Sequence, residues 1–320
     1  MPVLAIDLGG TKLAAAIVSE DGTILHEEKT SLRGRQGAEV GALIAGQAKM
    51  FLQGQEATSI TSIGVSVPGI SYQKKGTVWA PNIPGWEDYP LLNELKSVAP
   101  EIPVTIDSDR ACYILGEAWK GAAQGCSHAI FLAVGTGIGA GILVDGTILR
   151  GAHDIAGAIG WMALEKPYQQ QFVQCGCFES RASGDGIAKL ARDVLKETKD
   201  YNGGLKDKLP EELTAHDIFQ AHEENDVVAM RVIRQCVELW GMAVANLVSL
   251  FNPQKIILGG GVFGPAVKFI PLIYDEASKW AQPVSIKQVS IEPSALGHCA
   301  GLYGAAWLAL QNNNLPDADV

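Results

Sequence analysis

The sequence lacks the features that direct a chain into or across a membrane. No run of roughly 18 or more apolar residues occurs, so no membrane-spanning helix is predicted. The first residues, MPVLAIDLGG, contain neither a basic stretch nor a separate apolar stretch, which is not typical of a signal peptide. We therefore expect a cytoplasmic protein with no membrane partner.

Basic residues and cysteines are both scarce. The 25 Lys and Arg residues are outnumbered by 35 Asp and Glu residues, and the formal net charge of −10 argues against nucleic acid as a partner. The six cysteines are scattered, so we expect reduced thiols and not a disulfide framework. An acidic protein that binds phosphate must supply local donors, such as backbone N–H groups, helix N-termini or a metal ion.

The sequence does contain an internal repeat. AIDLGGTKLAAAIVSEDGTIL, at 5–25, and IFLAVGTGIGAGILVDGTIL, at 130–149, both predict a strand, a Gly-Thr turn, a strand, an Asp-Gly turn and a strand. DGTIL closes both segments. Chance similarity between two glycine hairpins is the alternative interpretation. The 320 residues, 47% of them hydrophobic, suffice for two domains with separate cores.

Helix and strand patterns alternate along the rest of the chain. Helices are predicted at 38–53, 109–120, 183–197, 214–222, 226–251 and 294–311. Strands are predicted at 60–68, 104–107 and 284–291, and at the start of 255–261, whose glycine turn leads to a helix beginning near Phe263. This alternation predicts an α/β fold. With the repeat it predicts two related α/β domains, with a ligand cleft between them as the default expectation.

Three glycine clusters are predicted to bind phosphate, because glycine has no Cβ and lets backbone N–H groups approach an anion. They are Gly9, Gly10, Thr11 and Lys12; Gly135, Thr136, Gly137 and Gly139; and Gly259, Gly260 and Gly261. Asp7 precedes the first cluster and is suited to hold Mg²⁺, through water. Each cluster alone is more typical of a tight hairpin. None has the spacing of a dinucleotide-binding turn or a P-loop, which argues against dehydrogenases and P-loop ATPases.

These clusters belong to a set of motifs that resembles the ROK family of sugar kinases and repressors. The motifs are DLGGTK at 7–12, GTGIGAG at 135–141, RGAHDIAGAIG at 150–160, GCFESRASG at 176–184 and LGGGV at 258–262. They follow the family's order over nearly the whole chain. The resemblance implies an actin-like, ribonuclease H-like fold in duplicate, with ATP and a sugar in the cleft between the domains.

The resemblance also implies an organisation for the chain. We expect an N-terminal domain at 1–118, a C-terminal domain at 119–293, and a final helix at 294–312 that packs back on the first domain. A homodimer is expected. The repressor branch carries an N-terminal helix-turn-helix; because the first motif begins at Asp7, we expect none here.

The family's catalytic aspartate matches Asp109, in the pair Ser108-Asp109. The resemblance implies that Asp109 accepts the proton of the attacking sugar hydroxyl. Without the motif, a helix cap would be the expected role of this residue. Gly69, Asn82, Ser108 and Glu179 match positions that line the family's sugar site. ATP is expected to place its phosphates on the loops 9–12 and 135–139 and its adenosine near 259–262.

The chain departs from the family pattern at Ser108, where the family has Asn, and in one further motif. Ala158 and Trp161 stand where the family has a sugar-binding Glu and a His that binds both sugar and a structural zinc ion. Of the zinc cysteines only Cys175 and Cys177 could remain, and a structural zinc site needs four ligands, so no zinc site is expected. Trp161 either stacks on the substrate or fills a core position. A sugar site that has lost groups which hydrogen-bond the sugar hydroxyls discriminates less well between related sugars. The preferred sugar therefore need not be glucose.

The sequence thus predicts an ATP- and Mg²⁺-dependent kinase for a sugar hydroxyl. The acceptor is left open among hexoses, ketoses, amino sugars and cyclitols. One alternative is a ligand sensor of the same fold with weak catalysis, which the lost sugar contacts favour. Another is an actin-like assembly ATPase, against which Asn82 and Glu179 argue.

Overall fold

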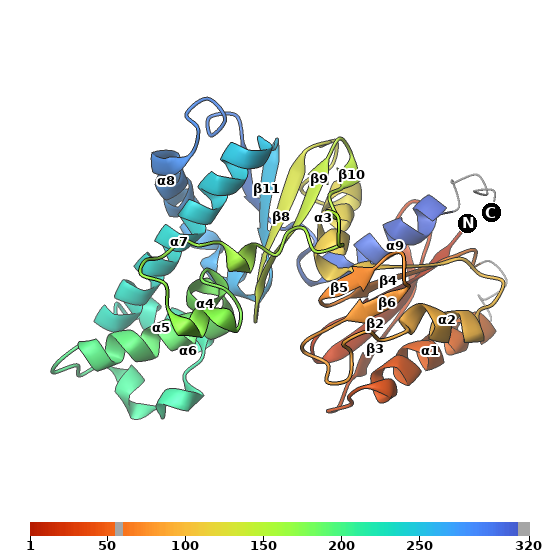
Figure 1. Cartoon of the computed structure of the whole chain (residues 1–320), viewed down its shortest axis with the longest axis horizontal. Helices are drawn as coiled ribbons and strands as arrows, with labels where there is room; N and C mark the ends of the chain where they lie inside the picture. The colour runs from red at the N-terminus through yellow and green to blue at the C-terminus, as the bar shows by residue number, and fades with distance from the viewer. Residues whose placement is uncertain (55–59, 313–320) are drawn as a thin grey trace. The chain divides into compact units, whose positions relative to one another are not determined.

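The computed structural model describes residues 1–54 and 60–312. The chain forms two compact units, each with its own five-stranded sheet (Figure 1). The first unit comprises 1–125, 148–156 and the segment from 295 onward; the second comprises 126–147 and 157–294. The boundaries predicted from the family, at 118 and 293, stay a prediction.

The first unit is built on the sheet β3-β2-β1-β4-β7. A meander of antiparallel strands, β1 to β3, is followed by β4 and β7, which run parallel to β1. The elements of this unit are β1 (Val3–Leu8), β2 (Lys12–Val18), β3 (Ile24–Ser31), α1 (Ala38–Gln53), β4 (Ile63–Val67), β5 (Ile70–Tyr72), β6 (Thr77–Trp79), α2 (Leu91–Val98), β7 (Val104–Ser108), α3 (Asp109–Lys120) and α9 (Ala300–Asn312).

The alternation of side chains along β1 assigns each face of this sheet to different helices. Leu4, Ile6 and Leu8 pack in a core with residues of α1 and α2. Val3 and Ala5, which point the other way, pack against α9. Asp7 lies two residues after Ala5 on the same strand. Because alternate residues of a strand point to the same face, its carboxylate lies on the α9 face of the sheet.

Glycines let α9 lie unusually close to its neighbours. A Cβ on Gly64 of β4 would lie 1.9 Å from the carbonyl oxygen of Ala305, and a Cβ on Gly304 would lie 1.9 Å from that of Cys112 in α3. A side chain at either position would therefore push α9 away from the sheet or from α3. Figure 1 shows α9 alongside the sheet of the first unit.

The second unit repeats the sheet of the first, with the order β10-β9-β8-β11-β12. An antiparallel meander again comes first, and two strands parallel to its first member follow. This shared topology confirms the repeat predicted from the two Gly-Thr segments. The elements are β8 (Ala129–Val134), β9 (Ile138–Val144), β10 (Thr147–Ile148), α4 (Glu179–Ala182), α5 (Gly184–Glu197), α6 (Ala215–Glu223), α7 (Val227–Phe251), β11 (Lys255–Gly259), α8 (Ile270–Trp280) and β12 (Ser290–Pro293).

The predicted long helix is confirmed as α7, which packs its apolar stripe in the core of the second unit. Val232, Val237 and Trp240 are buried there with other residues of the stripe. The Asp226 carboxylate accepts hydrogen bonds from the N–H groups of Val228 and Ala229 and caps the first turn.

The prediction of a strand at 284–291 is wrong over most of its length, since β12 begins only at Ser290. The Gln282 side chain accepts hydrogen bonds from the N–H groups of Val284 and Ser285, at 2.8 and 2.7 Å, and folds this segment into turns. A side chain that binds nearby backbone groups competes with strand pairing, and the alternating pattern does not reveal it.

Two helix starts were also predicted too early. After the third glycine cluster the chain forms 3₁₀ turns at Gly261–Phe263 and Pro265–Phe269, and α8 begins only at Ile270. The last helix begins at Ala300 and not at 294, because Gly297 has a φ of 53° and interrupts the helical path. Within residues 1–54 and 60–312, no helix has the length and apolar character needed to cross a membrane.

Candidate functional site

The site begins where β7 passes directly into α3. Ser108 is the N-cap of α3, and its hydroxyl accepts a hydrogen bond from the N–H of Ala111 at 3.3 Å. Asp109 is the first residue of the helix and does not cap it. The alternative role considered for Asp109 is therefore filled by its neighbour, and the Asp109 carboxylate is available for chemistry. Ser108 was predicted as a sugar contact, and its hydroxyl is engaged in this cap.

Two residues of α3 hold the Asp109 carboxylate. The N–H of Arg110 donates to Asp109 Oδ1 at 2.7 Å, and the Tyr113 hydroxyl lies 3.5 Å from Oδ2, a long and weak hydrogen bond. Burial raises the pKa of Asp109, while the Arg110 guanidinium and these hydrogen bonds oppose that rise. The negative charge of Asp109 raises the pKa of Tyr113 well above its ordinary value, so Tyr113 stays protonated as a donor.

Arg110 also connects Asp109 to a second predicted site residue, Gly69. The Arg110 Nη2 donates to the carbonyl oxygen of Gly69 at 3.2 Å. Gly69 lies between β4 and β5 with a φ of 88°, where a side chain would be strained. The sequence analysis missed Arg110 and Tyr113. The spacing of Asp109 and Tyr113, four residues apart on a helix, was the available signal for the second of them.

The first glycine cluster forms the turn between β1 and β2. The N–H of Gly9 donates to the carbonyl oxygen of Lys12 at 2.9 Å and closes the turn. Gly10, Thr11 and Lys12 are exposed, and a Cβ on Gly10 would meet no atom within 4 Å. The tip of this turn is therefore accessible to solvent, and an anion could approach its backbone N–H groups.

Asp7 lies at the end of β1, directly before this turn. Burial raises the pKa of Asp7 to about 6; the Ser66 hydroxyl and Lys12 oppose the rise, and the charge of Asp109 adds to it. A Cβ on Gly301 would lie 2.5 Å from Asp7 Oδ1, so the carboxylate rests on the first turn of α9. A cavity of about 50 Å³ beside it is lined by Asp7, Gly9 and Lys12 among others.

Mg²⁺ fits the groups found here. The ion prefers hard oxygen ligands and usually keeps several waters. Asp7 and Asp109 are two carboxylates close enough for the charge of Asp109 to raise the pKa of Asp7. A divalent cation would relieve that repulsion, and the buried Ser66 hydroxyl next to Asp7 is a further oxygen.

The second unit brings the other two glycine clusters together. The N–H of Gly135 donates to the carbonyl oxygen of Gly137 at 2.9 Å and closes the turn between β8 and β9. Gly260 has a φ of 90°, and a Cβ there would lie 2.4 Å from the carbonyl oxygen of Val134. The third cluster therefore lies against the base of the second, with Thr136 exposed at the tip.

Glu179 supports the second glycine turn from behind. Its Oε2 accepts a hydrogen bond from the N–H of Ile138 at 2.6 Å. The same oxygen would lie 2.8 Å from a Cβ on Gly137 and 3.0 Å from one on Gly160. Burial raises the pKa of Glu179, and the Ile138 hydrogen bond opposes the rise. The residue predicted as a sugar contact is thus also fixed to the second glycine turn, which the sequence analysis did not predict.

The segment 158–161, which departs from the family pattern, contains an exposed aromatic residue. Trp161 is 58% exposed at the end of a 3₁₀ turn, Ile159–Trp161, which excludes the interpretation that it fills a core position. Cys175 is half-buried and Cys177 is buried, both as free thiols. Within the described part of the chain, no group of three or more His, Cys, Asp or Glu residues could hold a metal ion. The expected lack of zinc stays a prediction.

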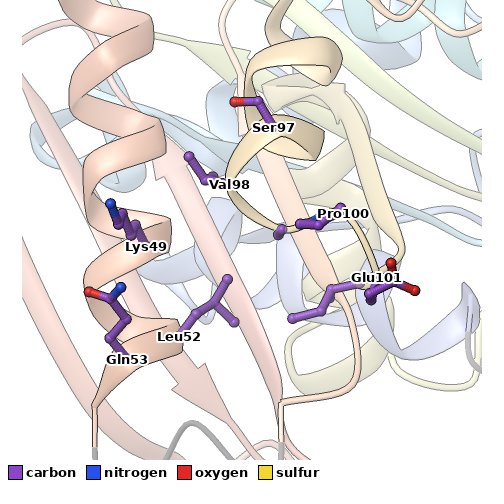
Figure 2. Close-up of a pocket in the computed structure, with 9 residues that line it drawn as sticks. Lys49, Leu52, Gln53, Ser97, Val98, Pro100 and Glu101 are labelled. Carbon is purple, nitrogen blue, oxygen red and sulfur yellow. The ribbon is translucent and has the colours of Figure 1, made fainter.

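The structure also contains a cavity that the sequence analysis did not predict. It measures about 410 Å³ and lies in the first unit (Figure 2). Lys49, Leu52 and Gln53 of α1 line it together with the segment 97–102. None of the predicted site residues is among them. Asn82, another predicted sugar contact, is exposed elsewhere in the unit, in the turn between β6 and α2.

Comparisons with known proteins agree with these observations. The model of the ROK family matches residues 3–312. A glucokinase of Halalkalibacterium halodurans is 32% identical, over 97% of this chain and 96% of its own length. A beta-glucoside kinase of Listeria monocytogenes is 29% identical, over 98% of this chain and 99% of its own. The solved structure of a ROK family glucokinase from Streptomyces griseus, in complex with glucose and AMPPNP, is 27% identical. It covers 97% of this chain and 100% of its own, with a TM-score of 0.77.

The fold and these relationships define an ATP-dependent sugar kinase with an actin-like α/β fold in duplicate, which confirms the predicted fold class and the predicted enzyme class. The chain belongs to the ROK family. The alternative of a catalytically weak ligand sensor is not favoured.

Proposed function

We propose that this protein transfers the terminal phosphoryl group of ATP to a hydroxymethyl group of a hexose or hexose derivative, with Asp109 as the general base. The observation that carries this proposal is the junction of β7 and α3. Ser108 caps the helix, so the Asp109 carboxylate is not used as the cap, and Arg110 and Tyr113 orient it. An ionised carboxylate at this place is suited to accept the hydroxyl proton as the bond to phosphorus forms.

The roles proposed for the other residues follow from their surroundings. The exposed turn tips at Gly10 to Lys12 and at Thr136 would bind the ATP phosphates through N–H groups and hydroxyls. Gly259, Gly260 and Gly261, which lie against the second turn, would border the adenosine. Asp7 would hold Mg²⁺ through water, and the ion would neutralise charge on the phosphates.

The acceptor is proposed from the relatives and from the sugar-binding positions. The relatives are named glucokinase and beta-glucoside kinase, so glucose and β-glucosides are the first candidates. Gly69, Asn82 and Glu179 retain the family's residue types, while Ala158 and Trp161 do not. Trp161 is exposed and offers a flat apolar face to a sugar ring or an aglycone. This favours a substituted sugar such as a β-glucoside over free glucose.

The test is an ADP-release assay with Mg²⁺-ATP and a panel of hexoses, β-glucosides, ketoses, N-acetylhexosamines and cyclitols. We expect turnover on a hexose or β-glucoside, and we expect Asp109→Asn to abolish it while the protein stays folded. Asp145→Asn is the matched control, because Asp145 is an exposed carboxylate in a turn of the second unit with a φ of 50°, which Asn tolerates. Turnover near that of the wild type in Asp109→Asn would refute the role of Asp109.

Two further predictions concern the protein as a whole. We propose a homodimer, which rests on the family resemblance, and a cytoplasmic location, which rests on the lack of signal-peptide and membrane-span patterns in the sequence. Sedimentation equilibrium of the purified protein tests the first, since a single species of one chain mass at micromolar concentration would contradict it. Fractionation of the producing cells tests the second.

A further inference from the structure

One loop of the second unit connects two of the proposed sugar contacts. We call the segment 161–178 the Trp161 loop; it begins at Trp161 and ends directly before Glu179. Its ends touch, because a Cβ on Gly176 would lie 2.6 Å from Trp161 Cα and 2.4 Å from the carbonyl oxygen of Gly160. Gly160 in turn contacts the Glu179 side chain. The loop therefore starts and ends beside Glu179, and a displacement of its first residue would move Trp161 relative to Glu179.

A single buried cation holds the middle of this loop. Arg181 of α4 is only 7% exposed. Its Nε donates to Glu165 Oε2 at 2.8 Å and its Nη2 to Glu165 Oε1 at 3.0 Å, which is the two-pronged geometry of strong guanidinium–carboxylate pairs. The Nη2 also donates to Gln169 Oε1 at 3.1 Å, and the guanidinium lies 5.8 Å from the centre of the Phe172 ring.

The same guanidinium anchors the loop to a helix. On its other side, Arg181 Nη1 donates to Asp193 Oδ2 of α5 at 3.2 Å. Arg181 thus joins three residues of the Trp161 loop to the helical layer of the second unit. Apart from a 3₁₀ turn at Gln170–Val173 and the end of the 3₁₀ turn at Ile159–Trp161, the loop has no regular secondary structure of its own. Local backbone hydrogen bonds, such as that from the Gly176 N–H to the carbonyl oxygen of Phe172, hold its second half, and the side-chain contacts of Arg181 attach it to the rest of the unit.

We propose that Arg181 is a positioning residue for the sugar acceptor, which fixes the Trp161 loop so that Trp161 and Glu179 face the substrate together. This inference rests on the proposed function, in which both residues contact the acceptor. Arg181 itself does not touch the substrate. Its loss would loosen the loop and weaken sugar binding, while the phosphate turns keep their own backbone hydrogen bonds.

The test compares two substitutions of Arg181 with a matched control. Arg181→Met keeps much of the apolar volume and removes the charge. Arg181→Lys keeps the charge but cannot make the two parallel hydrogen bonds to the Glu165 carboxylate. Arg231→Met is the control, because Arg231 pairs with Glu197 at 2.6 Å on the surface of the same unit. We expect Arg181→Met to raise the KM for the sugar by about tenfold or more, with kcat and the KM for ATP within about twofold. The KM of Arg181→Lys for the sugar should lie between those of the wild type and of Arg181→Met. Arg231→Met should have the kinetic constants of the wild type.

A merely structural role predicts a different result. It would lower the folded fraction, and therefore the apparent kcat, with the KM for the sugar unchanged, and this outcome would overturn the proposal. If Arg181→Met does not fold, Glu165→Gln weakens the same contact more gently by removing one charge. A rise of the sugar KM alone in that variant supports the proposal, and an unchanged KM overturns it.

Hydrogen exchange separates this inference from the proposed function. A wild-type protein without turnover on any sugar would refute the proposed function. Exchange of the amides at 161–178 can be measured in Arg181→Met and in Arg231→Met without any activity. Faster exchange confined to the Trp161 loop in Arg181→Met supports the role of Arg181. The same protection in both variants overturns it.

Discussion

The guanidinium of Arg110 donates a hydrogen bond to the carbonyl oxygen of Gly69 at 3.2 Å. This contact ties the β4–β5 turn to the first turn of α3, one residue after Asp109. The backbone N–H of Arg110 also donates a hydrogen bond to the Asp109 carboxylate. Arg110 therefore both orients the proposed base and holds the β4–β5 turn at Gly69. The positive charge of Arg110 opposes the effect of burial on the pKa of Asp109.

The first prediction concerns the pH dependence of turnover. Asp109 must be ionised to accept a proton, and Arg110 lowers its pKa against the rise that burial causes. Arg110→Met removes that charge, so the pKa of Asp109 should rise and the acid limb of kcat/KM should move to higher pH. Arg110→Lys keeps a cation and should leave the limb nearer the wild-type position. An unchanged profile in Arg110→Met would show that Asp109 does not control this limb.

The second prediction concerns the cap of α3. Ser108→Ala removes the hydroxyl that accepts from the Ala111 N–H and should lower the free energy of unfolding by about 1 kcal/mol. Ser108→Asn supplies another good N-cap residue and should cost less. Urea unfolding of both variants measures which of the two loses more free energy of unfolding. Equal destabilisation would mean that the cap contributes little and that side-chain size at this buried position decides.

The third prediction concerns Gly301, on which the Asp7 carboxylate rests. Gly301→Ala would place a Cβ 2.5 Å from Asp7 Oδ1, so Asp7 must move, and turnover should fall by about tenfold or more. Gly46→Ala is the matched control in α1, where a Cβ meets no atom within 4 Å. That variant should keep full activity and gain roughly 0.5–1 kcal/mol of stability. Wild-type turnover in Gly301→Ala would contradict the role of Asp7.

The fourth prediction concerns metal content. Cys175 and Cys177 are free thiols, and a structural zinc site needs four ligands. The purified protein should contain far less than one zinc ion per chain, and a chelator should leave its melting temperature unchanged. Elemental analysis and thermal unfolding check this. Stoichiometric zinc, with a melting temperature lowered by chelation, would refute the prediction.

Most elements of the fold could be predicted because their signals are local. The helix predicted at 109–120 is α3 with the same bounds, since the N-cap Ser108 and the glycine that follows Lys120 mark its ends in the sequence. The duplicated sheets could be predicted from the two Gly-Thr segments. The strand at 284–291 could not be excluded, because the alternation of residues does not reveal the hydrogen bonds that the Gln282 side chain accepts from the N–H groups of Val284 and Ser285.

The sequence by itself determined the class of this protein. Its glycine turns, its repeat and the order of its motifs can be seen in the sequence, and their resemblance to the ROK family implied an ATP-dependent sugar kinase. Only the tertiary structure decided how the site is supported. Gly69 and Arg110 are 41 residues apart, Glu179 and Ile138 are also 41 apart, and Asp7 and Gly301 lie at opposite ends of the chain. Such contacts depend on how strands and helices pack, and no local pattern encodes them.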